Sequence, residues 1–356
     1  MAKDVQSRNI GAIGKVLLTG HTGFKGIWMT LLLESLGLEV VGLSLPADSD
    51  SLYNRLGRAG AIDEHLFDIS DGDRVSKVIK DSQAKTVIHM AAQPLVLFSY
   101  QNPTKTFETN VMGTVNVLEG SFSSKKVETV VVVTTDKVYE NKNSGRRFVE
   151  SDSLAGKDPY SASKVGTEAA VAAWTQISKI HGGPTVITAR AGNVIGGGDF
   201  AKDRIIPDIV RGVVQGSEVE IRNPNSTRPW QHALDPIAGY LIAAIDGTER
   251  REPFSVNFGP NDPSLPVWEV VKSAEDTFGD KLQIRYPKTS INSLESQLLD
   301  LDSTWAKSNL NWSPARGQTE AIKDTFLWWD EVLTGKKSAL EACEVDITSF
   351  VKSHDL

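Results

Sequence analysis

KVLLTGHTGFKG, residues 15–26, is the stretch that decides the fold. Its first five residues form a short apolar run, which is typical of a buried strand in a parallel sheet. Glycines follow at positions 20, 23 and 26, where the chain turns from the strand into a helix. Apolar residues then recur at helical spacing, with Trp28 and Leu32 on one predicted face, and Gly37 ends the predicted helix.

The glycine-rich turn predicts a dinucleotide site. Glycines allow a tight turn and the close approach of a pyrophosphate, and the N-terminus of the following helix favours an anion. Strand, turn and helix are in register here, which a chance glycine triplet would not provide. We expect the cofactor-binding residues of this loop to be Gly20, His21, Gly23, Phe24, Lys25 and Gly26.

The predicted second strand departs from the usual dinucleotide pattern. An acidic residue about 20 positions after the glycines commonly binds the adenosine ribose. Here Ser44 occupies that position, whereas Asp48 and Asp50 come later, in a polar loop, and are expected to be solvated. Asp68 and Ile69, at the end of the predicted third strand, are expected to bracket the adenine ring.

Alternating strands and helices predict the fold class. Further strands are predicted at 40–45, 65–69, 87–90 and 129–134, and helices at 72–81 and 104–121. This alternation indicates an α/β fold with a Rossmann-like, doubly wound parallel sheet. The pattern breaks near residue 192. We therefore expect an NAD-binding domain over 1–191 and, over 192–356, mainly a smaller C-terminal substrate-binding lobe with C-terminal helices, some segments of which re-enter the first domain. The tail beyond Thr334 is left unassigned.

A tyrosine and a lysine four residues apart predict catalysis. Asp158 and Pro159 begin a predicted helix as N-cap and first residue. Tyr160 and Lys164 then share one face of it. A phenol is a poor base at neutral pH, but a nearby ammonium and a positive nicotinamide ring lower its pKa. The pair suits removal of a hydroxyl proton while hydride leaves the same carbon.

These motifs together resemble the extended short-chain dehydrogenase/reductase family. Within it, five segments resemble the CDP-glucose 4,6-dehydratases: GHTGFKG (20–26), AAQPLV (91–96), TTDKVYEN (134–141), ARAGNVIGGGD (189–199) and RPWQH (228–232). The resemblance runs from about residue 15 to residue 314. It implies bound NAD, a CDP-glucose substrate, a 4-keto-6-deoxy sugar product, and a homodimer or homotetramer. It also implies a role in deoxysugar biosynthesis, such as that of lipopolysaccharide O-antigen.

The resemblance also implies roles for matching residues. Thr135 would hydrogen-bond the sugar 4-hydroxyl beside Tyr160, and Asp136 would protonate the departing 6-hydroxyl. Lys137 occupies a position where related dehydratases carry glutamate. Further cofactor contacts are implied for Ala91, Ala92, Gln93 and Thr134. Substrate contacts are implied for Gln93, Asn193, Arg204 and Arg228.

Two questions stay open at the level of sequence. Lys137 is either the base that removes the C5 proton or a charged group that stabilises the developing enolate or orients Asp136. A 4-epimerase would also keep NAD bound, but it has no need of the Asp136 and Lys137 pair. A non-catalytic NAD-binding sensor is the other alternative, and the Tyr160 and Lys164 pair disfavours it.

Composition disfavours several other classes of protein. The chain has 356 residues, of which 40% are hydrophobic and 23% charged, and a net charge of -7. The absence of a long Lys/Arg run argues against a nucleic-acid partner, and the apolar runs are too short for a membrane span. The only cysteine is Cys343, so an intrachain disulfide is excluded. We therefore expect a cytoplasmic protein, and the scattered histidines predict no metal site.

Overall fold

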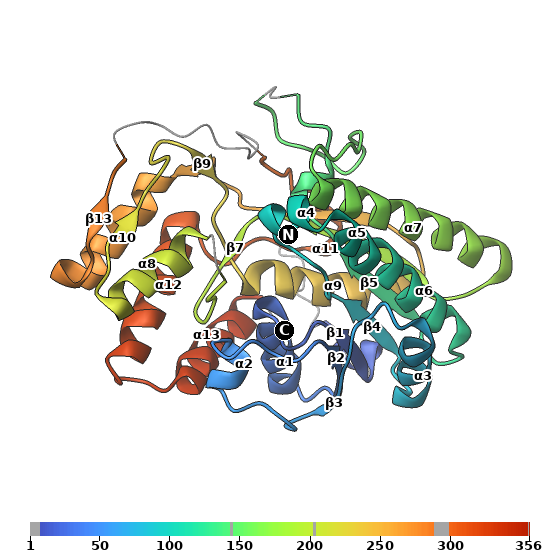
Figure 1. The fold of residues 1–356 in the computed structure, drawn as a ribbon. Coiled ribbons are helices and arrows are strands. Elements are labelled where there is room, and N and C mark those ends of the chain that lie inside the picture. Colours follow the sequence, from blue (N-terminus) through green and yellow to red (C-terminus); the bar gives the residue numbers. More distant parts are fainter. Residues whose placement is uncertain (1–7, 143–144, 202–203, 288–298, 355) are drawn as a thin grey trace, which may run out of the picture.

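A seven-stranded parallel sheet forms the centre of the computed structural model, which describes residues 8–142, 145–201, 204–287, 299–354 and 356 (Figure 1). Its strand order is β11-β6-β5-β4-β1-β2-β3. The strands are β1 (Val16–Thr19), β2 (Val40–Ser44), β3 (Asp63–Leu66), β4 (Thr86–His89), β5 (Thr129–Val133), β6 (Thr185–Ala191) and β11 (Ser255–Phe258). The predicted fold class, a Rossmann-like parallel sheet with flanking helices, is confirmed.

The strand order reverses beside the glycine turn. From β1 the chain builds β2 and β3 on one side, then crosses to β4, β5 and β6 on the other. Thr19 at the end of β1 is paired with Leu43 of β2 and His89 of β4. Ligands of open α/β sheets bind outside the carboxyl ends of strands where the order reverses. The glycine turn and the segment after β4 both begin at this point.

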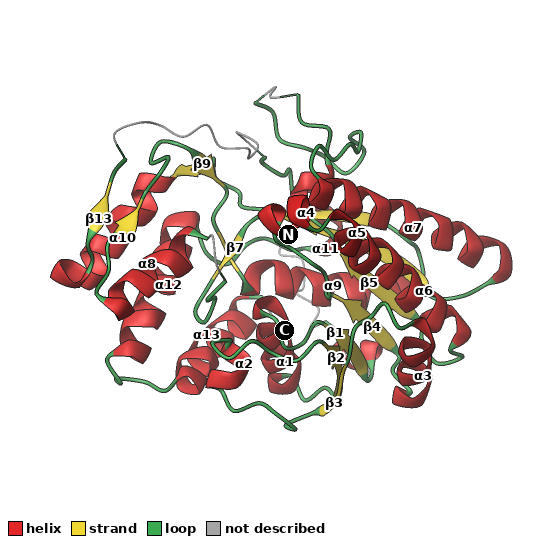
Figure 2. Cartoon of the chain, viewed as in Figure 1, coloured by secondary structure: helices red, strands yellow, loops and turns green. Residues whose placement is uncertain are grey.

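Helices cover both faces of the sheet (Figure 2). One core lies under α3 (Gly72–Ser82), α6 (Gly113–Ser123) and α7 (Pro159–His181), and the other under α1 (Phe24–Ser35) and α9 (Leu234–Arg250). The side chains of consecutive strand residues pack on opposite faces of the sheet: Leu17 lies in the first core, and Val16 and Leu18 lie in the second. Because both faces are covered, the strands are apolar throughout rather than alternating.

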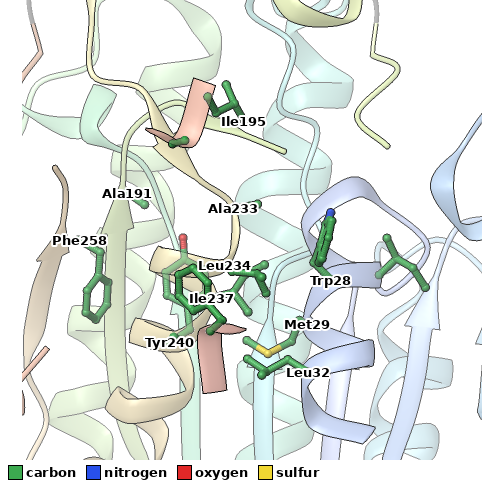
Figure 3. Close-up of a cluster of buried hydrophobic side chains, with 14 of the residues drawn as sticks. Trp28, Met29, Leu32, Ala191, Ile195, Ala233, Leu234, Ile237, Tyr240 and Phe258 are labelled. Carbon is green, nitrogen blue, oxygen red and sulfur yellow. The ribbon is translucent and has the colours of Figure 1, made fainter. Parts of the chain in front are cut away.

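Helix α1 is more buried than its predicted single apolar face suggests. Every residue from Gly26 to Leu33 is buried, because α9 and α13 (Ala339–Ser353) both pack against the helix. Figure 3 shows Trp28, Met29 and Leu32 meeting Leu234 and Ile237 of α9. Among the helices of the described segments, none has the length and apolar character to cross a membrane. The cytoplasmic location stays a prediction.

The first half of the chain differs locally from its predicted elements. The helix expected over 104–121 is α5 (Pro103–Phe107), a π-helical turn η2 (Glu108–Met112) and then α6. The strand expected over 65–69 is β3, which ends at Leu66, so Asp68 and Ile69 lie beyond it. The remaining short helices here are η1 (Ile10–Ile13), α2 (Leu52–Arg55), α4 (Val96–Gln101) and η3 (Asp136–Val138).

Beyond β6 the chain forms a smaller group of helices and two-stranded pairs. The pairs are β7 (Val194–Ile195) with β10 (Gln231–His232), β8 (Val219–Glu220) with β13 (Ile284–Arg285), and β9 (Thr227–Arg228) with β12 (Leu265–Pro266). The helices are α8 (Ile205–Gln215), α10 (Val267–Phe278), η4 (Gly279–Lys281), α11 (Thr304–Leu310) and α12 (Gln318–Leu333). Helix α9 and strand β11 belong to the layers of the main sheet. The division at residue 191 stays a prediction.

The tail that the sequence left unassigned forms helix α13. It begins with a capping box in which Ser338 and Glu341 exchange hydrogen bonds. Phe350 is 1% exposed. Its ring stacks on His232 and on His354, and the Arg316 guanidinium lies 5.0 Å from the ring centroid. Helix α13 therefore packs against α1 rather than extending into solvent.

We expect Phe350→Ala to lower the free energy of unfolding by about 3–5 kcal/mol, because it empties a filled aromatic site. Val345→Ala is the matched control, since Val345 lies on the same helix and is 53% exposed. Urea unfolding followed by circular dichroism measures both. Equal, small losses for the two variants would show that α13 does not contribute to the core.

Candidate active site

The glycine turn forms a cradle that side chains would fill. Gly20 has a φ of 77°, and a Cβ there would lie 2.8 Å from the backbone nitrogen of Ala91. A Cβ on Gly26 would lie 1.9 Å from the carbonyl oxygen of Gly20. Gly23 is exposed and occupies the N-cap of α1. The turn therefore brings the start of α1 against β1 and leaves backbone N–H groups at the edge of the sheet.

His21, which the sequence assigned to the cofactor, lies beneath the turn. Its side chain is 1% exposed and its Nε2 is 2.8 Å from Glu64 Oε2. The Tyr53 hydroxyl donates to the same carboxylate, and a Cβ on Gly42 would lie 2.6 Å from the His21 ring. Burial lowers the pKa of His21, and Glu64 opposes that shift. His21 thus supports the turn from below, through a carboxylate on β3 that the sequence gave no reason to single out.

The predicted adenosine contacts lie at the ends of β2 and β3. The Ser44 hydroxyl is 2.7 Å from that of Thr22 and is buried. Asp68 accepts from the Ser70 backbone and pairs with Lys105 at 3.0 Å. Ile69 is 4% exposed. Their roles toward adenosine stay predictions.

Thr135, Asp136 and Lys137 come together at the carboxyl end of β5. Thr135 caps η3, accepts from the Lys137 backbone and donates to Asp136 Oδ1 at 2.9 Å. Asp136 is 1% exposed, and Lys137 Nζ lies 3.7 Å from its Oδ1. A hydrogen bond joins Thr135 to the Tyr160 hydroxyl. The structure therefore brings the four predicted residues into one cluster.

Helix α7 supplies the tyrosine and the lysine. Its first turn has a full capping box between Asp158 and Ser161, with Pro159 at the first position, as the sequence predicts. Burial raises the pKa of the Tyr160 phenol, and the Lys137 ammonium opposes that shift. The catalytic roles of Tyr160 and Lys164 stay predictions.

Lys164 itself is buried at the base of the cluster. Its Nζ donates to the Val133 carbonyl at 3.2 Å, which directs the ammonium to the end of β5. Burial lowers the pKa of Lys164 to about 8, and the Glu168 carboxylate opposes that shift. Its ammonium also lowers the pKa of His89, for which burial is the larger cause.

Glu168 is a site residue that the sequence analysis missed. It lies four residues after Lys164, so Tyr160, Lys164 and Glu168 form one stripe on α7. Arg190 of β6 binds it through two bonds of 2.8 Å, and the Thr134 hydroxyl donates to it at 2.7 Å. All are buried. The repeated spacing of four was the signal that would have identified Glu168.

Two segments border the cluster. Gln93 is fixed by its own side chain, which donates to Thr106 and accepts from the Leu95 backbone. A Cβ on Gly192 would lie 3.1 Å from Asp136 Oδ2, so the backbone of Gly192 runs close to this carboxylate. Asn193 is the next residue along the chain. Ala92 is half-buried between Ala91 and Gln93.

The two predicted substrate arginines differ in position. Arg204, at the start of α8, pairs with the buried Asp199 at 3.1 Å. Its charge lowers the pKa of Tyr160, after the larger effects of burial and Lys137, so it faces the catalytic cluster. Arg228, on β9, donates to the Thr227 carbonyl.

Comparison with known proteins gives the family. Residues 16–259 match the model of the NAD dependent epimerase/dehydratase family. The chain belongs to this family. It is 37% identical over 333 residues to a CDP-glucose 4,6-dehydratase of Salmonella typhimurium, covering 90% of this chain and 92% of that protein. It is 25% identical to a dTDP-glucose 4,6-dehydratase of Xanthomonas campestris, covering 88% and 92%.

A solved structure of the family shows the same fold. The UDP-glucose 4-epimerase of Stenotrophomonas maltophila, with bound NAD and formylated UDP-arabinopyranose, superimposes with a TM-score of 0.79 at 20% identity. The match covers 91% of this chain and 100% of the epimerase. Epimerases and dehydratases of the family therefore share this scaffold, and the cluster of side chains has to distinguish them.

We expect Glu168→Gln to lower the free energy of unfolding by about 3–5 kcal/mol, because it leaves the buried Arg190 charge without its carboxylate. Asp81→Asn is the control, since it removes the solvent-exposed partner of Lys77 and should leave unfolding unchanged. Chemical denaturation measures both. Restored stability in the double variant Glu168→Gln, Arg190→Met would confirm that the uncompensated charge is the cause.

Proposed function

We propose that this chain converts CDP-glucose to CDP-4-keto-6-deoxyglucose and water. It is a nucleotide-sugar 4,6-dehydratase, a hydro-lyase, on its similarity to such enzymes. The observation that carries the proposal is the cluster of Thr135, Asp136 and Lys137 beside Tyr160. It places an acid and an amine next to the phenol that would act at the sugar 4-hydroxyl.

The choice of CDP-glucose rests on relative similarity. Identity is 37% to the CDP-glucose enzyme and 25% to the dTDP-glucose enzyme, over nearly the same share of this chain. Lys137 also supports CDP-glucose as the substrate, because the resemblance to CDP-glucose enzymes includes the segment TTDKVYEN, in which this lysine lies.

The residues present fit NAD. In the cradle of Gly20, Gly23 and Gly26, a Cβ on two of the three glycines would clash with backbone atoms. The absence of side chains there suits the close approach of a pyrophosphate to the start of α1. Asp68 and Ser44 would hold the adenosine end, and Lys164 the nicotinamide ribose. Bound NAD would supply a reversible hydride acceptor, taking hydride from sugar C4 and returning it to C6.

Tyr160 would accept the 4-hydroxyl proton as the C4–H bond breaks. Burial alone raises the pKa of the phenol, which opposes this role. Lys137, the Thr135 hydrogen bond and Arg204 each lower that pKa. Asp136 acts in the opposite direction and the pKa of the phenol stays above its usual value, so these three groups offset only part of the effect of burial.

Asp136 would protonate the departing 6-hydroxyl, and Lys137 would act as a cation. The lysine lies 3.7 Å from a buried carboxylate, which favours its charged form. A charged amine beside the phenol would stabilise negative charge on O4 while the Asp136 carboxylate of the ion pair takes the C5 proton and gives it to the departing 6-hydroxyl, which leaves as water. Of the two roles left open by the sequence, the ion pair favours the electrostatic one.

The alternatives fit these side chains less well. A 4-epimerase returns hydride to C4 and eliminates no water, so it has no use for an acid and an amine beside the phenol. A non-catalytic sensor has no use for a buried tyrosine and lysine that are held in place by Thr135 and Val133. Gln93, Asn193, Arg204 and Arg228 are proposed to hold the nucleotide sugar, with Arg204 the best placed.

We also propose that the chain forms a homodimer. Helices α4 and α5 and the turn η2 expose a group of large apolar side chains beside α7: Leu97, Phe98, Tyr100, Phe107 and Met112. Exposed apolar groups of this kind mark contact surfaces. Sedimentation velocity of the purified chain would show a dimer, and Phe107→Glu should yield monomer.

Turnover should remove one water from CDP-glucose with no net production of reduced cofactor, because hydride is taken and returned within one site. Mass spectrometry of the product and absorbance of free reduced nicotinamide measure the two quantities. The nucleotide is tested by offering dTDP-, GDP- and UDP-glucose in parallel. An epimeric sugar of unchanged mass, or stoichiometric free NADH, would contradict the proposal.

Lys137→Met should slow product formation by about 10²–10⁴, the usual contribution of one positioned catalytic group, and leave the first hydride transfer partly intact. Enzyme-bound reduced cofactor should then accumulate. Lys137→Arg separates the two roles: a charged group is partly replaced by arginine, whereas a base is not. Wild-type rates of product formation and of C5 exchange with deuterated solvent in Lys137→Met would remove Lys137 from the mechanism.

A further inference from the structure

Lys25 is a cation of the glycine turn whose side chain contacts Tyr240 of α9. It is the second residue of α1, and its Nζ lies 3.4 Å from the Tyr240 hydroxyl and 5.4 Å from the centroid of that ring. Tyr240 belongs to α9 and is fully buried. Figure 3 shows it packed with Leu234 and Ile237 of the same helix. The half-buried lysine is therefore held on the α1 and α9 side of the sheet.

The charges that act on Lys25 are those of the catalytic cluster. Burial, followed by the charges of Lys164 and Arg204, lowers the pKa of Lys25 to about 7, and Asp136 opposes that shift. Tyr240, its direct partner, is in turn close enough to act on Tyr160. Lys25 thus faces the same space as Tyr160 and Lys164, but from the opposite layer of helices.

We propose that Lys25 places a positive charge against the nicotinamide of the cofactor and so favours its neutral, reduced form over its cationic, oxidised form. The proposal rests on the proposed function. The ring that exchanges hydride has to reach the carbon whose hydroxyl proton goes to Tyr160. It therefore has to enter the space between α7 and the start of α1, where Lys25 already lies.

The charge balance gives the consequence for the reaction. When the C4–H bond of the sugar breaks, its electron pair leaves as hydride, the 4-hydroxyl proton goes to Tyr160, and the cation beside Lys25 is neutralised. Like charges that repel before the transfer no longer do so after it. Lys25 therefore assists the oxidation of C4 and weakens binding of the oxidised cofactor, an effect that binding measurements detect without turnover.

The test compares three probes with the full chain by titration calorimetry: NAD, NADH and ADP-ribose, which lacks the nicotinamide. In Lys25→Met the ratio of dissociation constants, NAD over NADH, should fall by about tenfold, a modest value for two unit charges at an effective dielectric constant near 20. ADP-ribose affinity should not change. Lys25→Arg should keep the wild-type ratio, and Lys77→Met, on the solvent face of α3, serves as the matched control.

Each other outcome has a distinct meaning. Equal weakening of all three probes in Lys25→Met would assign Lys25 to a diphosphate and overturn the proposal, as would an unchanged ratio. Failure of the wild-type chain to bind any of the three probes would instead overturn the proposed function. The affinity of the wild-type chain for NAD should rise between about pH 6 and pH 8, and this rise should be absent in Lys25→Met. Such a result would assign the titration to Lys25 rather than to Lys164, Arg204, Asp136 or Tyr240, which face it.

Discussion

The buried ion pair between Glu168 and Arg190 is the interaction on which the catalytic cluster depends. It joins α7 to β6 across the sheet edge, and the Thr134 hydroxyl ties the same carboxylate to the end of β5. Two buried charges are costly unless each is fully hydrogen-bonded, and here both are. The pair fixes the rotation of α7 about its axis, and hence the direction in which Tyr160 and Lys164 project.

The fixed position of α7 determines which charged groups surround the Tyr160 phenol. Lys164, Arg204 and Asp136 act on Lys25, and Lys137, Asp136 and Arg204 act on the phenol. An excess of cations is tolerated because the proposed ligands are anionic: a dinucleotide, a nucleotide diphosphate sugar and a developing enolate. Burial, Lys164 and Arg204 lower the pKa of Lys25 to about 7, whereas burial lowers that of Lys164 to about 8 against the opposing charge of Glu168.

Sequence patterns were sufficient for the parts of the structure that depend on short-range order. The strand, glycine turn and helix over residues 15–36, the capped start of α7 and the parallel sheet all follow from local spacing. Glu64 and Arg190 were not recoverable in this way, because each is defined by a partner distant in the chain, His21 and Glu168 respectively. Helix α13 was missed for a related reason: its polar sequence conceals a buried stripe that has meaning only against α1.

The scaffold itself does not choose between epimerase and dehydratase, since a 4-epimerase superimposes on nine-tenths of this chain. The choice lies in the turn η3, three residues long, at the carboxyl end of β5. There the backbone of Lys137 is held by the Thr135 hydroxyl, and that hydroxyl also bonds Asp136 and Tyr160. One threonine therefore contacts the phenol, the acid and the backbone of the lysine at once. Under the proposed function, the side chains of this turn add chemistry at C5 and C6 to a site for C4 oxidation that the cofactor cradle and α7 provide.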